Sequence, residues 1–306
     1  MRDIPYVATA LAPGSCGELV QGTLDGISFL VTCPVAVYSR ATVTLLPGHD
    51  EVMLSGQKGT EGPWTKTEVA LTKTLEFMGL EGWGARVEIE SRLPRGKGMA
   101  SSTADVCAAI IAAGAGAGRI PSPEEVARIA LSVEPSDGIM FPGIALFDHV
   151  TGRVQSSLGD APPLEVLVFD YGGEVDTIAF NNRKDLSTLN VAKEARVRQA
   201  LSHIIEGIER RDPRSLGRGA TMSALANQDI LVKPGLGDVV YLATGTLGAV
   251  GVCVAHSGTV MGVLFEGLSM DQETRARREI LKVCPGLGFL FHTRLTGGGI
   301  ELEGGA

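Results

Sequence analysis

Two patterns of apolar residues recur in the first half of the chain, one typical of strands and one of helices. Residues 27–46 are rich in β-branched and apolar side chains around Pro34, which predicts two strands or one broken strand. Residues 84–91 alternate between apolar and polar, as a half-buried strand does. Residues 106–117 are almost all apolar, and a helix that is apolar on every side is normally buried.

Two helix starts are marked by proline. Pro63 precedes apolar residues at helical spacing, so a helix is predicted to begin there. Ser122 is followed by proline and, at the third position, by Glu125, which is the pattern of a capping box. This second helix is predicted to extend to about residue 133, because Pro135 cannot continue it.

The second half of the chain mixes helices and strands without strict alternation, which favours an α+β fold. The stretch 158–163, LGDAPP, resembles a linker, so we predict domains at residues 1–160 and 161–306. The strands predicted in this half are residues 164–169 and 288–295, and the helices are residues 192–211, 215–228 and 271–283.

The stretch between Asp238 and Glu266 carries no permanent charge and is long enough to cross a bilayer. Glycine, threonine and serine interrupt it, however. It divides into a part with helical spacing and two β-branched parts, 248–255 and 259–265. We therefore predict a buried helix and a hairpin here, and no membrane span.

Composition narrows the classes of function. The 306 residues include 27 Lys and Arg against 35 Asp and Glu, so the net charge is −8, and nucleic acid is not an expected partner. The N-terminus lacks the basic start and apolar core of a signal peptide. The five cysteines are scattered without a C-x-x-C pair, which favours a reducing compartment and predicts a cytoplasmic protein.

The stretch 93–106, LPRGKGMASSTADV, carries the clearest candidate chemistry. It is not a Walker P-loop, because Ser91 stands where the first glycine should be and Gly98 follows the lysine. Its two glycines still allow backbone N–H groups to turn toward an anion, and Ser101 and Ser102 fall where a helix should begin. From these residues alone, a phosphate loop and a glycine turn with a serine N-cap are equally good interpretations.

This stretch resembles the second signature of the GHMP kinases, P-x-G-x-G-[LM]-[GA]-S-S-[AST], a family that includes galactokinase, homoserine kinase and mevalonate kinase. Residues 248–259 resemble the C-terminal signature of that family, and residues 13–19 the N-terminal one without its usual histidine. The resemblance implies a domain like domain 2 of ribosomal protein S5, followed by a ferredoxin-like domain, with ATP in the cleft between them. The implied phosphate-binding residues are Pro94, Gly96, Lys97, Gly98, Met99, Ala100, Ser101, Ser102 and Thr103.

Four shorter stretches resemble the L-threonine kinase branch of the family, namely residues 13–22, 31–35, 134–137 and 146–149. This resemblance implies phosphorylation of L-threonine to L-threonine O-3-phosphate, which is used in cobalamin synthesis. The alternatives are another acceptor of the family, such as homoserine, mevalonate or a sugar alcohol, and a non-catalytic nucleotide-binding regulator.

The resemblance also implies catalytic roles. Ser102 and Glu134 would hold Mg²⁺, an ion that takes few protein oxygens and completes its shell with phosphate and water. Asp137 would accept the proton of the acceptor hydroxyl or orient that hydroxyl, since a carboxylate beside Mg²⁺ is expected to have a low pKa. Lys97 would contact the β- or γ-phosphate or lie in solvent.

Residues from the two outer signatures are expected to form the acceptor pocket. Glu18 would bind the ammonium group of an amino acid or order the loop around it. Cys16 would line the pocket and not act as a nucleophile, because no basic partner is evident near it. The predicted set is Ser15, Cys16, Glu18, His256, Ser257 and Gly258.

Overall fold

The centre of the fold is a long hairpin of strands β1 (Val7–Leu24) and β2 (Ile27–Pro47). Asp25 and Gly26 turn between them at φ of 52° and 80°, as in the two-residue turns that match the twist of paired strands. Because β2 is one continuous strand, the predicted break at Pro34 is wrong. Pro34 lies opposite Ser15, where β1 bulges, and a ladder that is already irregular tolerates the missing N–H of proline.

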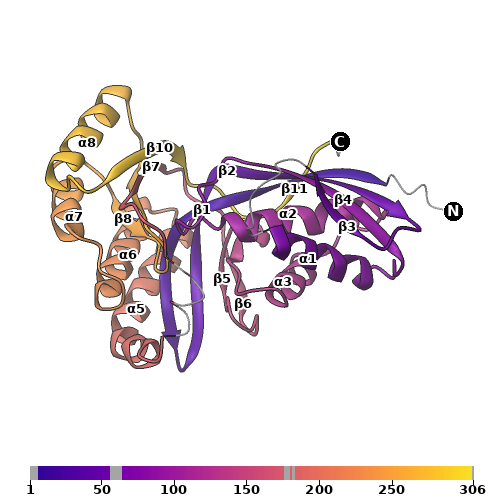
Figure 1. Ribbon diagram of the computed structural model, residues 1–306. Coiled ribbons are helices and arrows are strands. Elements are labelled where there is room, and N and C mark those ends of the chain that lie inside the picture. Colours follow the sequence, from indigo (N-terminus) through magenta and orange to yellow (C-terminus); the bar gives the residue numbers. More distant parts are fainter. Residues whose placement is uncertain (1–5, 56–63, 176–179, 181–182, 305–306) are drawn as a thin grey trace.

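The computed structural model, which describes residues 6–55, 64–175, 180 and 183–304, shows this hairpin at the middle of one extended sheet (Figure 1). The strand order is β10-β7-β9-β8-β1-β2-β4-β3, and only the β3–β4 pair is parallel among the strand pairs described. The small strand β11 pairs with β1, β5 pairs with β2, and β6 pairs with β5. The remaining bounds are β3 (Val52–Ser55), β4 (Trp83–Ser91), β5 (Ile144–Phe147), β6 (Gln155–Gly159), β7 (Glu165–Asp170), β8 (Gly251–Val254), β9 (Val260–Phe265), β10 (Gly288–Arg294) and β11 (Glu301–Leu302).

The helices form two groups at the two ends of the sheet (Figure 1). In the first group α2 packs on both strands of the hairpin, and in the second α5 and α6 pack on β1. Both groups contribute buried side chains to one continuous core. The helices are α1 (Trp64–Phe77), α2 (Ser101–Gly116), α3 (Pro123–Leu131), α5 (Leu186–Glu209), α6 (Pro213–Ala226), α7 (Leu236–Gly245) and α8 (Met270–Val283).

Several predicted elements are confirmed. The capping box of α3 forms, with Ser122 and Glu125 each accepting the backbone N–H of the other, although α3 ends two residues earlier than predicted. The uncharged stretch before Glu266 contains α7 and the β8–β9 hairpin, and none of the described helices is both long and apolar enough to cross a membrane. The start predicted at Pro63 lies outside the described residues.

The two halves of the chain are connected at more than one point. Strand β1 pairs with β2 and also with β8, and β11 returns the end of the chain to Ala10 and Leu11 of β1. The mixed α and β class is confirmed. A boundary near residue 160 stays a prediction, because the strands of both halves form one sheet.

Candidate active site

The glycine loop that ends on α2 is left-handed at alternate residues. Gly96, Gly98 and Ala100 have φ of 68°, 81° and 54°, an arrangement that turns neighbouring N–H groups toward a common side. Ser101 and Ser102 open the helix, as predicted, but the capping position belongs to Ala100, which makes no side-chain cap. The alternative interpretation, a glycine turn with a serine N-cap, is therefore wrong. The free N–H groups and dipole of an uncapped helix start favour an anion.

The three stretches that resemble family signatures meet at this loop. The N–H of Ser15 donates to the carbonyl of Met99 at 3.0 Å, and the N–H of Gly17 donates to the carbonyl of Gly98 at 3.1 Å. From the other side, a Cβ on Gly98 would lie 2.3 Å from the Cβ of Ala255. Segments distant in sequence thus hold the loop on two sides.

Gly258 completes the contact and supports a prediction. A Cβ there would lie 2.4 Å from the carbonyl oxygen of Lys97 and 2.5 Å from the Cα of Gly98. Because these are backbone atoms, the loop itself must shift, and we expect Gly258→Ala to lower kcat/KM by at least about 10-fold. Gly267→Ala is the matched control, since nothing lies within 4 Å of its Cβ and neither glycine has a positive φ. Steady-state kinetics test this, and wild-type kcat/KM in Gly258→Ala would show that the contact is dispensable.

Ser102 and Glu134 come together as predicted for a metal-binding pair. The hydroxyl of Ser102 donates a hydrogen bond to Oε1 of Glu134, and Lys66 on α1 forms an ion pair with Oε2. A hydroxyl and a carboxylate are ligands that Mg²⁺ accepts beside phosphate and water, so these residues fit the ion. The sequence does not point to Lys66, because nothing in its helix sets it apart from other surface lysines.

Asp137 lies just after Glu134 and precedes a short 3₁₀ turn, Gly138–Met140. Its backbone N–H donates to Oγ1 of Thr103 at 3.4 Å. Burial, followed by the charges of Glu18 and Glu134, raises the pKa of Asp137 to about 7. This direction is opposite to the low pKa expected beside Mg²⁺, because burial among carboxylates disfavours ionisation whereas a cation favours it.

Glu18 is buried and is held by His256. Its Oε2 accepts the backbone N–H of His256 at 2.8 Å and lies 2.9 Å from the ring Nδ1, while Nε2 lies 3.1 Å from Oγ of Ser223. Burial lowers the pKa of His256 well below its usual value. Nδ1 faces two acceptors, Oε2 of Glu18 and the carbonyl of Val254, so it is the nitrogen that donates. The predicted role of His256 as a substrate ligand is corrected, because both ring nitrogens are engaged and the ring positions Glu18.

The other predicted pocket residues divide into two kinds. Ser15 is 1% exposed, and its hydroxyl has no hydrogen-bond partner among the described residues, which is unusual for a buried polar atom. Cys16 instead packs into the core, where a Cβ on Gly262 would lie 2.8 Å from its Sγ. A hydrogen bond with Cys253, together with burial, raises the pKa of Cys16, so it neither lines the pocket nor serves as a nucleophile. Ser257 is half-buried in the turn between β8 and β9.

Lys97 does not lie free in solvent. Its Nζ is 3.0 Å from Oδ2 of Asp170 and also donates to the carbonyl of Gly173. The lysine therefore ties the glycine loop to the end of β7. A phosphate contact by Lys97 stays a prediction.

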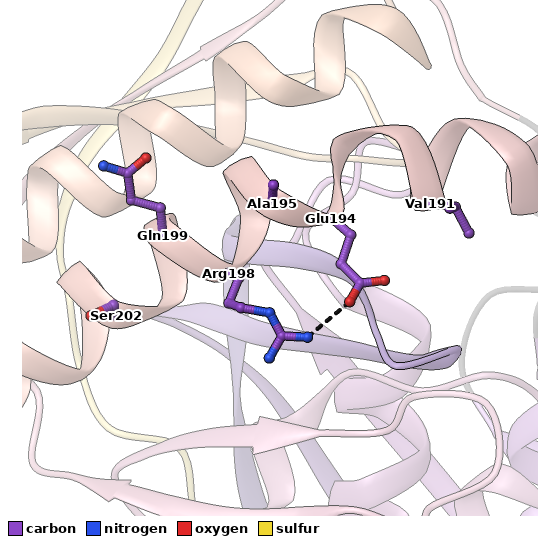
Figure 2. Close-up of a pocket in the computed structure, with 6 residues that line it drawn as sticks. All are labelled: Val191, Glu194, Ala195, Arg198, Gln199 and Ser202. Atoms are coloured by element: carbon purple, nitrogen blue, oxygen red, sulfur yellow. Dashed lines mark hydrogen bonds and ion pairs between the residues drawn. The ribbon is translucent and has the colours of Figure 1, made fainter.

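A hollow of about 620 Å³ on α5 contains none of these residues (Figure 2). Its two charged side chains, Arg198 and Glu194, pair with each other at 2.9 Å, as the dashed line shows. This hollow therefore offers a ligand little charge. The lining residues are Val191, Glu194, Ala195, Arg198, Gln199 and Ser202.

The fold is that of small-molecule kinases. The structure is similar to a homoserine kinase from Cytophaga hutchinsonii, with a TM-score of 0.69 at 18% identity and 99% of both chains covered. It is also similar to the mevalonate kinase of Methanococcus jannaschii, with a TM-score of 0.69 at 13% identity over 97% of this chain and 100% of that one.

Sequence comparison gives the family. The chain is 33% identical over 260 residues to the L-threonine kinase of Salmonella typhimurium, covering 85% of this chain and 83% of the relative. It is 34% identical over 262 residues to the L-threonine kinase of Citrobacter freundii, covering 85% and 87%. The model of the GHMP kinases N terminal domain matches residues 67–143. The chain belongs to the GHMP kinase family and is an ATP-dependent kinase with a hydroxyl acceptor.

Proposed function

We propose that the protein phosphorylates the hydroxyl of L-threonine, with ATP and Mg²⁺, to give L-threonine O-3-phosphate for cobalamin synthesis. The observation that carries this proposal is the uncapped start of α2, where the left-handed glycine loop meets Ser102, Glu134 and Asp137. Relatives that are L-threonine kinases support the choice of acceptor. All five cysteines are free and buried, which supports a reducing compartment such as the cytoplasm.

In this proposal the residues of the chain bind and orient the reactants. Backbone N–H groups of residues 96–102 bind the triphosphate. Asp137 takes the proton of the acceptor hydroxyl while the hydroxyl oxygen bonds to the γ-phosphorus, and the bond from that phosphorus to the β–γ bridging oxygen breaks to release ADP. Ser102 and Glu134 would hold Mg²⁺, which offsets phosphate charge when bound.

The proposed division at residue 160 gives both domains a share in the site. The first domain, of the ribosomal protein S5 domain 2 type, contributes Ser15, Glu18, the glycine loop 96–102, Glu134 and Asp137. The ferredoxin-like second domain contributes residues 256–258. The close contacts of Gly98 with Ala255 and Gly258 support a phosphate site between them.

An acceptor panel tests the function. ADP release is measured with L-threonine, L-homoserine, L-serine and mevalonate, and we expect the highest kcat/KM for L-threonine. A missing methyl group is expected to make L-serine about 10- to 100-fold poorer. The product is identified as the O-3-phosphate by phosphorus NMR and mass spectrometry. Faster turnover of homoserine or mevalonate would overturn the choice of threonine, and no ADP release with any acceptor would favour a regulator.

A further inference from the structure

Two lysines are buried in the second half of the chain near Glu18. Lys193 on α5 is 2% exposed, and Lys233, in the loop before α7, is 4% exposed. A buried ammonium group normally has a carboxylate partner, because removing its charge from water is costly. Neither lysine has a carboxylate within 4.0 Å among the residues that the structure describes.

Both ammonium groups are linked to the turn of the C-terminal signature, Lys233 directly and Lys193 through Asn227. Nζ of Lys193 donates to Oδ1 of Asn227 at 3.1 Å, and Nδ2 of Asn227 donates to the carbonyl of His256 at 3.3 Å. Nζ of Lys233 donates to the carbonyl of Gly258. A protonated lysine has three N–H groups, and only one of the three on each lysine has an acceptor among the described residues. Lys233 also faces the ring of Tyr171, 6.0 Å from its centroid.

Glu18 connects the lysines to the catalytic residues. Its Oε2 accepts the N–H of His256, whose carbonyl accepts from the Asn227 amide that Lys193 binds, and Lys233 binds the carbonyl of Gly258 two residues further on. Glu18 and both lysines are therefore linked to one turn, and the charge of Glu18 also raises the pKa of Asp137. One oxygen of Glu18, Oε2, is occupied by His256, whereas Oε1 accepts no hydrogen bond from the described residues. The unpartnered hydroxyl of Ser15 lies on the same strand. Positive, negative and neutral polar groups thus gather beside the proposed proton acceptor.

The sequence carries a signal for Lys193 that is easy to overlook. The buried face of α5 follows helical spacing, and Lys193 occupies a place on it. A lysine within an apolar stripe is uncommon and requires a reason beyond solubility. The stripe consists of Lys193, Val197, Ala200, Leu201, Ile204, Gly207 and Ile208.

We propose that Lys193 and Lys233 bind the α-carboxylate of the acceptor while Oε1 of Glu18 binds its α-ammonium group, so that the site selects free α-amino acids. This inference rests on the proposed amino-acid kinase function. It adds two residues that determine specificity, Lys193 and Lys233. It also requires that the acceptor have a free α-carboxylate beside the side chain that bears the hydroxyl. An alcohol without that carboxylate would leave the remaining N–H groups of both lysines without an acceptor.

The test combines substitutions in the protein with a change of substrate. Full-length wild type, Lys193→Met and Lys233→Met are assayed with L-threonine and with L-threonine amide, which keeps the hydroxyl and the ammonium group but lacks the carboxylate charge. We expect wild type to prefer L-threonine by about 10- to 100-fold in kcat/KM. Each variant should raise KM for L-threonine by about 10-fold or more, leave KM for ATP within about twofold, and lose most of the preference. Lys282→Met, at an exposed lysine of α8, is the control.

The outcomes separate the possibilities. If the variants lose equal kcat/KM with L-threonine and with its amide, the lysines only stabilise the loop. If the variants raise KM for ATP alone, the lysines bind the phosphates of ATP. Either result overturns the inference. If a lysine variant fails to fold, the ratio of kcat/KM for L-threonine to that for its amide in wild type still tests whether the site binds the carboxylate. Equal turnover of threonine and its amide overturns the carboxylate site but leaves the kinase assignment intact, whereas turnover of neither overturns the proposed function as well.

Discussion

Glu134→Gln should lower kcat by about 10²- to 10³-fold, the scale on which loss of one preorganised electrostatic contact slows an enzyme. Oε1 of Glu134 accepts the hydroxyl of Ser102, and Oε2 pairs with Lys66. Glutamine keeps the size of the side chain and an oxygen for the Ser102 hydrogen bond. It removes the negative charge that would hold Mg²⁺ and that balances the ammonium group of Lys66.

Nucleotide binding supplies a measurement that does not depend on turnover. By calorimetry, wild type should bind ATP more tightly with Mg²⁺ than with a chelator, and Glu134→Gln should lose most of that difference. Glu76→Gln, at an exposed position of α1, is the control and should behave as wild type. A kcat within threefold of wild type, with the Mg²⁺ effect on ATP binding intact, would remove Glu134 from the metal site.

Local signals account for what the sequence predicted correctly. The Ser122–Glu125 capping box and the helical spacing before Gly248 each specify an element from a few adjacent residues. The Asp25–Gly26 turn is a signal of the same kind, and with it the first hairpin was predictable in principle. Residues 7–24 were nonetheless not assigned to a strand, because Pro13 and several glycines interrupt the alternation where β1 bulges.

The arrangement of the candidate site depends on contacts between segments that are distant in the sequence, and the periodicity of apolar residues does not encode such contacts. His256 was expected to face the substrate, yet it holds Glu18 from 238 positions away in the sequence. Cys16 was expected to line the pocket, yet the glycine at 262 leaves room for its sulfur in the core. A pattern of apolar residues says which face is buried but not what it is buried against. Lys66 is therefore visible as a site residue only once the helices are packed, whereas Lys193 can be recognised by its place in the apolar stripe of α5.

Asp137→Asn is the second change for which we expect a large effect, a fall in kcat of about 10²- to 10⁴-fold. Asparagine has nearly the same shape, and the backbone contact to Thr103 does not depend on the side chain. Burial raises the pKa of this carboxylate to about 7, which suits a proton acceptor near neutral pH, although bound Mg²⁺ would lower that pKa; an amide cannot accept the proton at all. Asp137→Asn should therefore retain ATP binding and melting temperature while losing turnover.

The pH dependence of kcat distinguishes a proton acceptor from an orienting group. Burial raises the pKa of Glu18 to about 7 as well, so the two carboxyls titrate in the same range. In wild type, kcat should fall as the pH drops through this range, because protonated Asp137 can no longer take a proton. The charge of Glu18 raises the pKa of Asp137, so Glu18→Gln should move this acid limb to lower pH while mainly raising KM for the acceptor. In Asp137→Asn, the kcat that remains should no longer fall at acid pH. A loss of less than about 10-fold with the acid limb unchanged would mean that Asp137 only orients the hydroxyl, and that transfer depends on positioning and charge neutralisation alone.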